Sequence, residues 1–279
     1  MESNPKRKQV QVSCCRMLRN VSFNDEMTPI LLAKNFIAMV VEAVTSFTDC
    51  EELHCEELHT LACQFFINIG SRSPQASIQS ILTLMKRNTD SVSLHRVACG
   101  ALYFLTKEDS IDTKTIVEIL ARTARTHSSD VKVLENVVNV LMNLSSLKRE
   151  SAMIYDSGCM TTVVNAMKEN SSATGLVMSG SRFCGNMALV SPQYADEAIG
   201  GIQPMLDCMN THPSALKLAE EVCKSLRCMV LKSELCRNYL LQNNGVSIIE
   251  KTLAFNTTSQ RWQTLLLDEL FQFYHFTHA

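Results

Sequence analysis

Hydrophobic and polar positions along the chain follow a helical pattern that restarts about every forty residues. Seven segments share one order, in which apolar residues are followed by one polar or small position and then by another apolar residue. The segments are CRMLRNVS, CQFFINIG, CGALYFLT, VNVLMNLS, RFCGNMAL, KSLRCMVL and DELFQFYH. The aligned position falls at Asn20, Asn68, Phe104, Asn143, Asn186, Cys228 and Gln272, at intervals of 48, 36, 39, 43, 42 and 44. This period predicts an all-α solenoid of stacked repeats with two or three helices each.

A second series of positions keeps step with the first in the C-terminal half. The segments SGCMTTVV, IGGIQPML and NNGVSIIE align Gly158, Gly200 and Asn244 at intervals of 42 and 44. Glycine and asparagine adopt the left-handed backbone conformation more easily than other residues. We therefore expect each of the three to end a short helix just before the next one begins. The N-terminal half shows no such glycine.

Composition supports helices and limits the classes of function. Glycine (9) and proline (6) are both scarce, so the tight turns of β-hairpins must be few. A hydrophobic content of 46% is enough for a core. The net charge of -2 produces no general attraction for polyanions, and no nucleic-acid partner is expected.

Localisation is predicted from what the N-terminus and the apolar stretches contain. No apolar segment typical of a signal peptide follows the first residues. The longest apolar stretch, residues 29–47, contains Lys34 and Glu42, so no membrane insertion is expected. Twelve cysteines without a secretory signal indicate a reducing compartment in which most thiols are buried. We expect a cytoplasmic protein, with the nucleus as the alternative because residues 5–8 read PKRK.

Two adjoining motifs carry a resemblance to a known family. VLMNLS at 140–145, followed by SGCMTTVVNAM at 157–167, resembles the armadillo repeat, and a HEAT-type helical repeat is the alternative. The resemblance implies a right-handed α-solenoid of about six repeats in a single domain, 1–279. The repeats would be 1–22 (partial), 23–70, 71–107, 108–146, 147–190, 191–232 and 233–279. In the armadillo repeat this motif belongs to the third helix. Because its first copy here, CRMLRNVS, ends at residue 22, we expect the chain to begin inside a repeat.

In armadillo proteins the third helices line a concave groove, and the asparagine of each motif binds the backbone of an extended peptide. The resemblance assigns this role to Asn20, Asn68, Asn143 and Asn186. Nuclear-import adaptors carry tryptophan one helical turn earlier, where this chain has Arg16, Asn139, Arg182 and Lys224 among others. With Arg227 added, the basic residues predict an acidic or phosphorylated peptide. The alternative is that the asparagines order helix ends and the basic residues form a solvated surface.

A regulator, a nuclear-transport adaptor and an enzyme are the alternatives to the peptide scaffold. A regulator of a GTPase or chaperone would bind a folded partner through apolar residues such as Phe271, Phe273, Tyr274 and Phe276. A nuclear-transport adaptor would need the missing tryptophans. The segment GLVMSGSR has Ser181 where a phosphate-binding loop needs lysine, and it predicts a turn between helices. No enzyme activity, catalytic residue or cofactor is expected.

The tandem repeat CEELHCEELH, residues 50–59, looks at first like a metal site. On a helix, Cys50 and His54 share one face, while Cys55 and His59 lie about 140° round. Four ligands that diverge in this way cannot close a tetrahedral site, so no metal is expected. Thr48 and Glu51 have capping-box spacing, and the segment predicts the start of a helix. A site built from Cys55, His59 and ligands elsewhere is the alternative.

Overall fold

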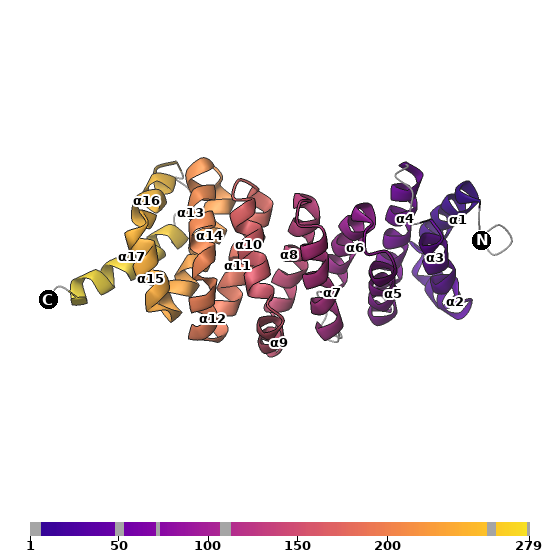
Figure 1. Cartoon of the computed structure of the whole chain (residues 1–279), viewed down its shortest axis with the longest axis horizontal. Coiled ribbons are helices and arrows are strands. Elements are labelled where there is room, and N and C mark those ends of the chain that lie inside the picture. The colour runs from indigo at the N-terminus through magenta and orange to yellow at the C-terminus, as the bar shows by residue number, and fades with distance from the viewer. Residues whose placement is uncertain (1–6, 48–52, 71–72, 107–112, 256–260, 278–279) are drawn as a thin grey trace. The chain divides into compact units, whose positions relative to one another are not determined.

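The structure is a computed structural model that describes residues 7–47, 53–70, 73–106, 113–255 and 261–277, with the side chains of 53, 54 and 272–277 excepted (Figure 1). Every regular element in these ranges is a helix, which confirms the predicted all-α class. The α-helices are α1 (Lys8–Val21), α2 (Thr28–Ala33), α3 (Phe36–Thr45), α4 (Leu53–Gly70), α5 (Pro74–Arg87), α6 (Val92–Leu105), α7 (Thr113–Thr126), α8 (Val131–Ser145), α9 (Ser151–Asp156), α10 (Cys159–Glu169), α11 (Thr174–Val190), α12 (Pro192–Glu197), α13 (Ile202–Thr211), α14 (Leu216–Lys232), α15 (Glu234–Gln242), α16 (Gly245–Phe255) and α17 (Arg261–Thr277). Short 3₁₀ helices are η1 (Asp25–Met27), η2 (Lys148–Glu150) and η3 (Ala198–Gly201).

The chain forms two compact units, an N-terminal unit (Met1–Val140) and a C-terminal unit (Leu141–Ala279), and the boundary falls within α8. The sequence suggested one continuous domain, which stays a prediction. No single described helix is long and apolar enough to cross a membrane, although the pair Asp25–Ala33 and Phe36–Thr45, bent by 74°, passes the same test together.

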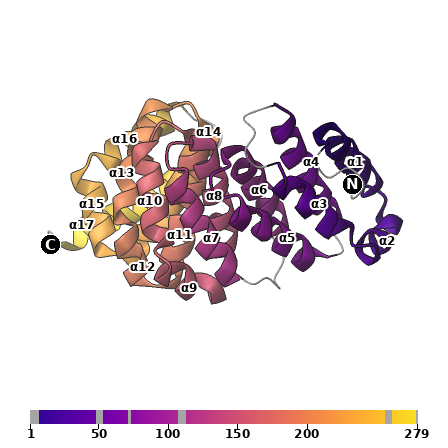
Figure 2. The same cartoon turned by 45° about the vertical axis from the view of Figure 1, so that its right-hand side comes forward.

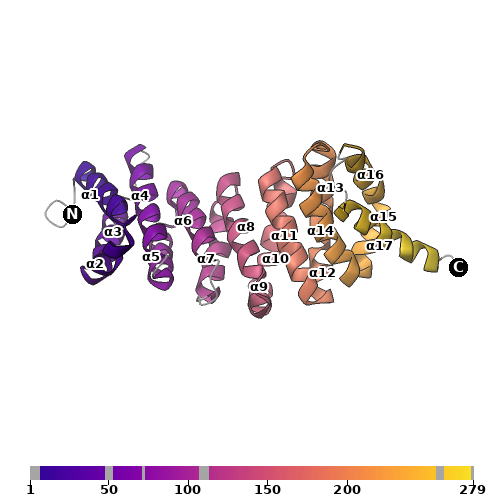
Figure 3. The ribbon, with the colours of Figure 1, turned by 180° about the vertical axis from the view of Figure 1, so that it is seen from behind.

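Each unit is built by stacking third helices, which carry the repeated motif. In the N-terminal unit α1 packs on α4 and α4 on α6; in the C-terminal unit α11 packs on α14 and α14 on α17 (Figures 1 and 3). Apolar residues at helical spacing face these contacts, as in α4, where Leu58, Leu61, Phe65 and Ile69 are all buried. The repeats therefore bury their apolar faces against one another, as the period predicted.

The number of helices per repeat differs along the chain. In the C-terminal unit a short first helix (α9, α12 or α15) precedes each second helix (α10, α13 or α16). In the N-terminal unit only residues 71–73 separate α4 from α5, too few for such a helix. The sequence motif GLVMSGSR lies inside α11, so the predicted turn between helices is wrong there. Its Gly180 instead lets α11 lie against Met167 of α10.

Left-handed residues mark the entry to the second helices only in part as expected. Gly158 (φ 70°) and Asn244 (φ 59°) confirm the prediction at the starts of α10 and α16. Gly200 lies in η3 without a positive φ, so the prediction is wrong at that position. A side chain there would approach Val164 and Lys168 to 3.1 Å, so the glycine serves a close contact. In the N-terminal half, Asn35 (φ 57°) takes the left-handed role before α3.

Candidate functional site

The residues expected to bind a peptide all lie on third helices, in two separate groups. The N-terminal unit holds Arg16 and Asn20 on α1, Asn68 on α4 and Asn139 on α8. The C-terminal unit holds Asn143 on α8, Arg182 and Asn186 on α11, and Lys224 and Arg227 on α14. Arg16, Asn20, Arg182 and Lys224 are exposed, and the others are half-buried.

Asn68 hydrogen-bonds to the end of the preceding third helix. Its Nδ2 donates to the Ser22 hydroxyl at 2.9 Å and to the Arg19 carbonyl at 3.3 Å. The Ser22 hydroxyl in turn donates to the same carbonyl at 2.7 Å. The three groups close a small network that links the C-terminal turn of α1 to α4.

Asn186 makes an equivalent hydrogen-bond network in the C-terminal unit. Its Nδ2 donates to the Ser145 hydroxyl at 3.1 Å and to the Met142 carbonyl at 3.4 Å, and the Ser145 hydroxyl donates to that carbonyl at 2.8 Å. The motif Asn-x-Ser thus has a structural use, because the serine of one repeat accepts from the asparagine of the next. The helix-ordering role left open by the sequence is present at both positions, while peptide binding by these amides stays a prediction.

Replacing Asn186 with alanine is expected to destabilise the C-terminal unit by about 1–2 kcal/mol, because the buried Ser145 hydroxyl and Met142 carbonyl lose their donor. The only tryptophan, Trp262, lies in this unit, so its fluorescence in a urea titration reports the loss. In a double-mutant cycle with Ser145→Ala the two losses should be less than additive, since both changes remove one shared bond. Fully additive losses would contradict the network.

Carboxylates on the next third helix neutralise three of the predicted basic residues. Arg182 pairs with Glu221 through two contacts of 3.0 and 2.5 Å, and Arg227 lies 3.4 Å from Glu269. Arg16 pairs with Glu57 in the N-terminal unit. These glutamates were not among the residues predicted from the sequence, because the prediction considered only the basic and amide positions of each helix. The available signal was their spacing, which is 41, 39 and 42 residues after the arginines, about one repeat.

Lys224 has an aromatic neighbour instead of a carboxylate. Its Nζ lies 5.6 Å from the centre of the Trp262 ring, and the Arg261 guanidinium lies 5.4 Å from the same ring. Such distances are typical of cation–π contacts. Trp262 lies on the last helix, α17, and its contact with Lys224 of the preceding repeat could not be predicted from the sequence. We call Arg182, Asn186, Lys224, Arg261 and Trp262 the third-helix surface.

The close approach of α11 and α14 brings this surface together. A side chain on Gly185 would come within 3.0 Å of the Ser225 backbone. Asn186 directly follows that glycine and Lys224 directly precedes that serine, so the two polar side chains start from the narrowest point between the helices. Arg182 lies one turn before Asn186 on the same face of α11.

The tandem CEELHCEELH shows no metal site in the part that the structure describes. The thiol of Cys55 donates to the Phe47 carbonyl at 3.3 Å, and His59 Nδ1 lies 3.0 Å from the Ser93 hydroxyl. Among the described residues, no three His, Cys, Asp or Glu side chains converge on a point where a metal ion could bind. Cys50, the side chain of His54 and the Thr48–Glu51 capping box lie outside the described residues.

The thiols behave as the sequence suggested. All the described cysteines are free, and nine of them are buried. Burial raises the pKa of Cys63 and Cys184 to about 12, with a further contribution from Cys236 at Cys184. A thiol that stays protonated at neutral pH is a poor nucleophile and a poor metal ligand. These cysteines therefore act as small apolar core residues.

Comparison with known proteins identifies the fold. No protein-family model matches the chain, and no curated protein matches it. Two engineered proteins from a structural genomics consortium each match with a TM-score of 0.52 and 15% identity, over 96% and 95% of this chain and 92% and 93% of their own. A designed armadillo repeat protein matches with a TM-score of 0.52 and 14% identity, over 95% of each chain.

At this low identity the likeness concerns the fold alone. Together with the all-α structure, the match to a designed repeat protein places the chain in the class of all-α helical-repeat folds, as predicted from the period. Within that class, the match to the designed repeat protein confirms the armadillo-like character that VLMNLS and SGCMTTVV suggested.

Proposed function

We propose that this chain is a non-catalytic scaffold that binds an extended segment of a partner protein on the third-helix surface. The observation that carries the proposal is the pair of cations around Trp262. Lys224 and Arg261 lie over this ring, and neither forms an ion pair with another residue in the described ranges. A half-buried aromatic ring between two such cations suits an apolar side chain with an acidic or phosphorylated neighbour.

Asn186 and Arg182 would contact the same segment further along. The amide of Asn186 is held in place by Ser145, and the Arg182 guanidinium by Glu221, so neither side chain has to be ordered on binding. A preformed surface of this kind lowers the entropic cost of association. Because Glu221 neutralises Arg182, selection for negative charge rests mainly on Lys224 and Arg261. The free thiols are compatible with a reducing compartment such as the cytoplasm.

Reversing the charges of Lys224 and Arg261, which form no ion pair with a described residue, provides the test. On an array of 15-residue peptides that are acidic, phosphoserine-containing, basic or neutral, the wild-type chain is expected to retain acidic and phosphorylated peptides. Lys224→Glu with Arg261→Glu should reduce retention at least about tenfold, a loss of about 1.4 kcal/mol in binding. Binding should also weaken as salt is raised from about 50 to 500 mM, because the contacts are exposed.

Lys232→Glu is the matched control, since this exposed lysine is also on α14 but in its last turn. It should leave retention unchanged. Retention of basic peptides would favour the nuclear-transport adaptor, and retention of no peptide class would overturn the proposal. Circular dichroism establishes that each variant is folded.

A regulator that binds a folded partner is the second candidate. It is favoured by the exposure of Phe271, whose side chain is 44% accessible on α17. The other members of the predicted aromatic cluster, Phe273, Tyr274 and Phe276, have side chains outside the described residues. If the chain is such a regulator, Phe271→Ser should abolish binding of the partner. Binding by the wild-type chain should then depend little on salt, because the contact is apolar.

A further inference from the structure

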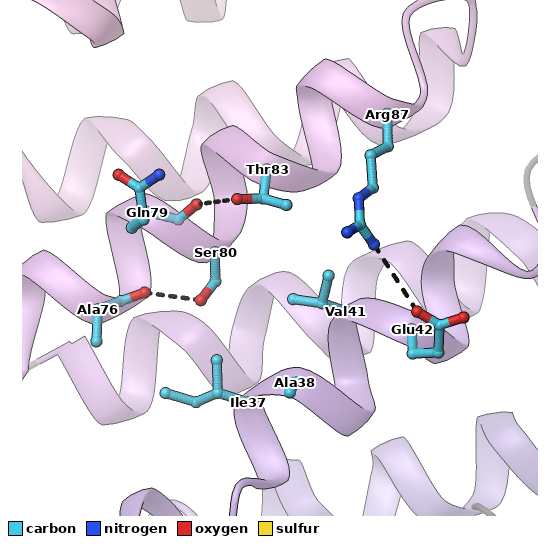
Figure 4. A pocket seen from close by; sticks show the side chains of 9 residues that line it. All are labelled: Ile37, Ala38, Val41, Glu42, Ala76, Gln79, Ser80, Thr83 and Arg87. Atoms are coloured by element: carbon cyan, nitrogen blue, oxygen red, sulfur yellow. Dashed lines mark hydrogen bonds and ion pairs between the residues drawn. The ribbon is translucent and has the colours of Figure 1, made fainter.

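A groove runs between α3 and α5 in the N-terminal unit, away from the third helices (Figure 4). The two second helices lie side by side, and the space between them is about 420 Å³ (Figures 2 and 4). Ile37, Ala38 and Val41 line it from α3, and Ala76 and Ser80 line it from α5. Three of these five side chains are small, and this is why the helices do not close the space.

The hydroxyl groups in the groove are already bonded. Ser80 donates to the Ala76 carbonyl and Thr83 to the Gln79 carbonyl, both at 2.7 Å. These hydroxyl donors therefore need no hydrogen-bond acceptor from a bound partner, and the groove surface behaves as apolar for most of its length.

The groove lies where the C-terminal unit carries a first helix. There α12 packs against α11 and α14, and η3 (Ala198–Gly201), which follows it, packs against α10 and α13. Gly200 of η3 comes so close to Val164 that a side chain would approach it to 3.1 Å. Val164 is six residues after the left-handed Gly158, and Val41 is six residues after the left-handed Asn35. The groove residue Val41 is thus the counterpart of Val164, but the chain supplies no first helix before α5.

The open end of the groove is basic. Arg87 lies 3.8 Å from Glu42 at this end, and both side chains are largely exposed (Figure 4). Exposed Lys86 directly precedes Arg87 in the last turn of α5 and forms no ion pair with another described residue. The last turn of α5 therefore carries two cations, whereas Glu42 is the one carboxylate among the described residues that line the groove.

The end of α5 that carries these cations is linked through His95 to the end of α7. His95 donates from Nε2 to the carbonyl of Asn88, which caps α5, and its ring centre lies 4.7 Å from that of His127, which follows α7. The end of the helix that carries Lys86 and Arg87 is therefore held in place.

From these features we infer that the groove is a docking site for a short helix of a partner protein. The helix would place small apolar residues against Val41 and Ala76, as η3 does against Val164, and would present a carboxylate to Arg87 and Lys86. Charge complementarity at the open end and the precedent of η3 within the same chain define this occupant. The site uses other helices than the third-helix surface and does not depend on the function proposed above.

The experiment uses a fluorescent peptide with the sequence of residues 191–202, SPQYADEAIGGI, titrated into the full chain and followed by fluorescence polarisation. Saturable binding is expected, at least about tenfold stronger than that of the matched peptide in which Asp196 and Glu197 are replaced by lysine. Ala38→Trp, which fills the groove from an exposed position, should weaken binding at least about tenfold. Arg87→Glu should reverse the preference between the two peptides.

Gln75→Trp is the control for the added ring, because Gln75 is exposed on α5 but does not line the groove. It should leave binding unchanged. The η3 residues of this peptide pack against α10 and α13 in the folded chain, so the added peptide could also bind there instead of in the groove. Insensitivity of binding to both Ala38→Trp and Arg87→Glu would therefore overturn the inference. Absence of saturable binding up to about 1 mM would do the same.

Discussion

Lowering the pH from 7 to 5 is expected to destabilise the N-terminal unit selectively, by roughly 4 kcal/mol at most. The cause is a pair of buried histidines, His59 and His95, which are 1% and 2% exposed. Burial lowers the pKa of each to about 4, and at His95 the neighbouring His127 and Arg122 lower it further, while the Asn88 carbonyl acts in the opposite direction.

The hydrogen bonds of His95 show why its neutral form is preferred. Nε2 donates to the Asn88 carbonyl, so in the neutral ring Nδ1 is an acceptor for the Thr123 hydroxyl, 3.0 Å away. A proton on Nδ1 would turn that acceptor into a donor and place a charge beside His127 in a buried site. The folded state therefore resists protonation of this ring.

The sign of the pH effect follows from the lowered pKa values. In the unfolded chain both histidines take up protons near pH 6.5, whereas in the folded unit they do so only near pH 4. Stability is thus complete above pH 6.5 and falls as the pH drops from 6.5 towards 4. At pH 5 each histidine costs about 2 kcal/mol by linkage, a large share of the roughly 5–15 kcal/mol that holds a domain folded.

Two measurements separate the units. Trp262 fluorescence follows only the C-terminal unit, and hydrogen exchange of amides in α4 to α7 follows the N-terminal unit. Exchange in α4 to α7, corrected for its intrinsic pH dependence, should rise steeply between pH 7 and 5. The variant His59→Gln with His95→Gln should flatten this rise, because glutamine does not titrate. An unchanged slope in the double variant would show that other groups cause the effect.

The repeat period was readable from the sequence because each repeat uses the same apolar positions, and Asn68 and Asn186 fell on equivalent sites for that reason. The partners of the basic residues were not readable in the same way. The pairing of Arg182 with Glu221 depends on how far α14 is shifted along α11, and a single helix carries no information about that shift. The groove beside Val41 depends on the short connection before α5 and on small side chains from two repeats.

Glycines in this chain have two different roles, one at the turns between helices and one inside helices. Gly158 did take the left-handed conformation, but Gly180 and Gly185 lie within α11, where neighbouring helices approach closely. A glycine tolerated for contact and a glycine required for a turn look alike in a sequence. Only the position of the neighbouring helix distinguishes them.

Gly185→Leu is accordingly expected to destabilise the C-terminal unit by about 3 kcal/mol, at the upper end of the usual cost of overpacking. A Cβ at this position would lie 3.0 Å from the Ser225 Cα and 3.1 Å from its Cβ and Oγ. Because one of these atoms belongs to the backbone of α14, a rotamer change cannot relieve the contact and the two helices must separate. A urea titration followed by Trp262 fluorescence measures the loss.

A pair of alanine variants isolates the contact from helix propensity. Gly100 is also on a third helix, α6, but a Cβ there would meet its nearest neighbour, Asn136 Nδ2, at an ordinary 3.7 Å. Gly100→Ala should therefore stabilise the N-terminal unit by up to about 1 kcal/mol, as alanine does inside helices. Gly185→Ala should show no such gain, and an equal gain at both sites would mean that α11 and α14 are not in close contact.

The Gly185→Leu variant also tests whether the spacing between α11 and α14 determines the arrangement of the third-helix surface. Separation of α11 from α14 would move Arg182 away from Glu221 and Asn186 away from Lys224, while leaving Lys224 and Trp262 in contact on α14 and α17. At a temperature where Gly185→Leu is still folded, binding of acidic peptides should then weaken without being lost. Complete retention of affinity would mean that the Lys224–Trp262 end of the surface suffices and that α11 contributes stability alone.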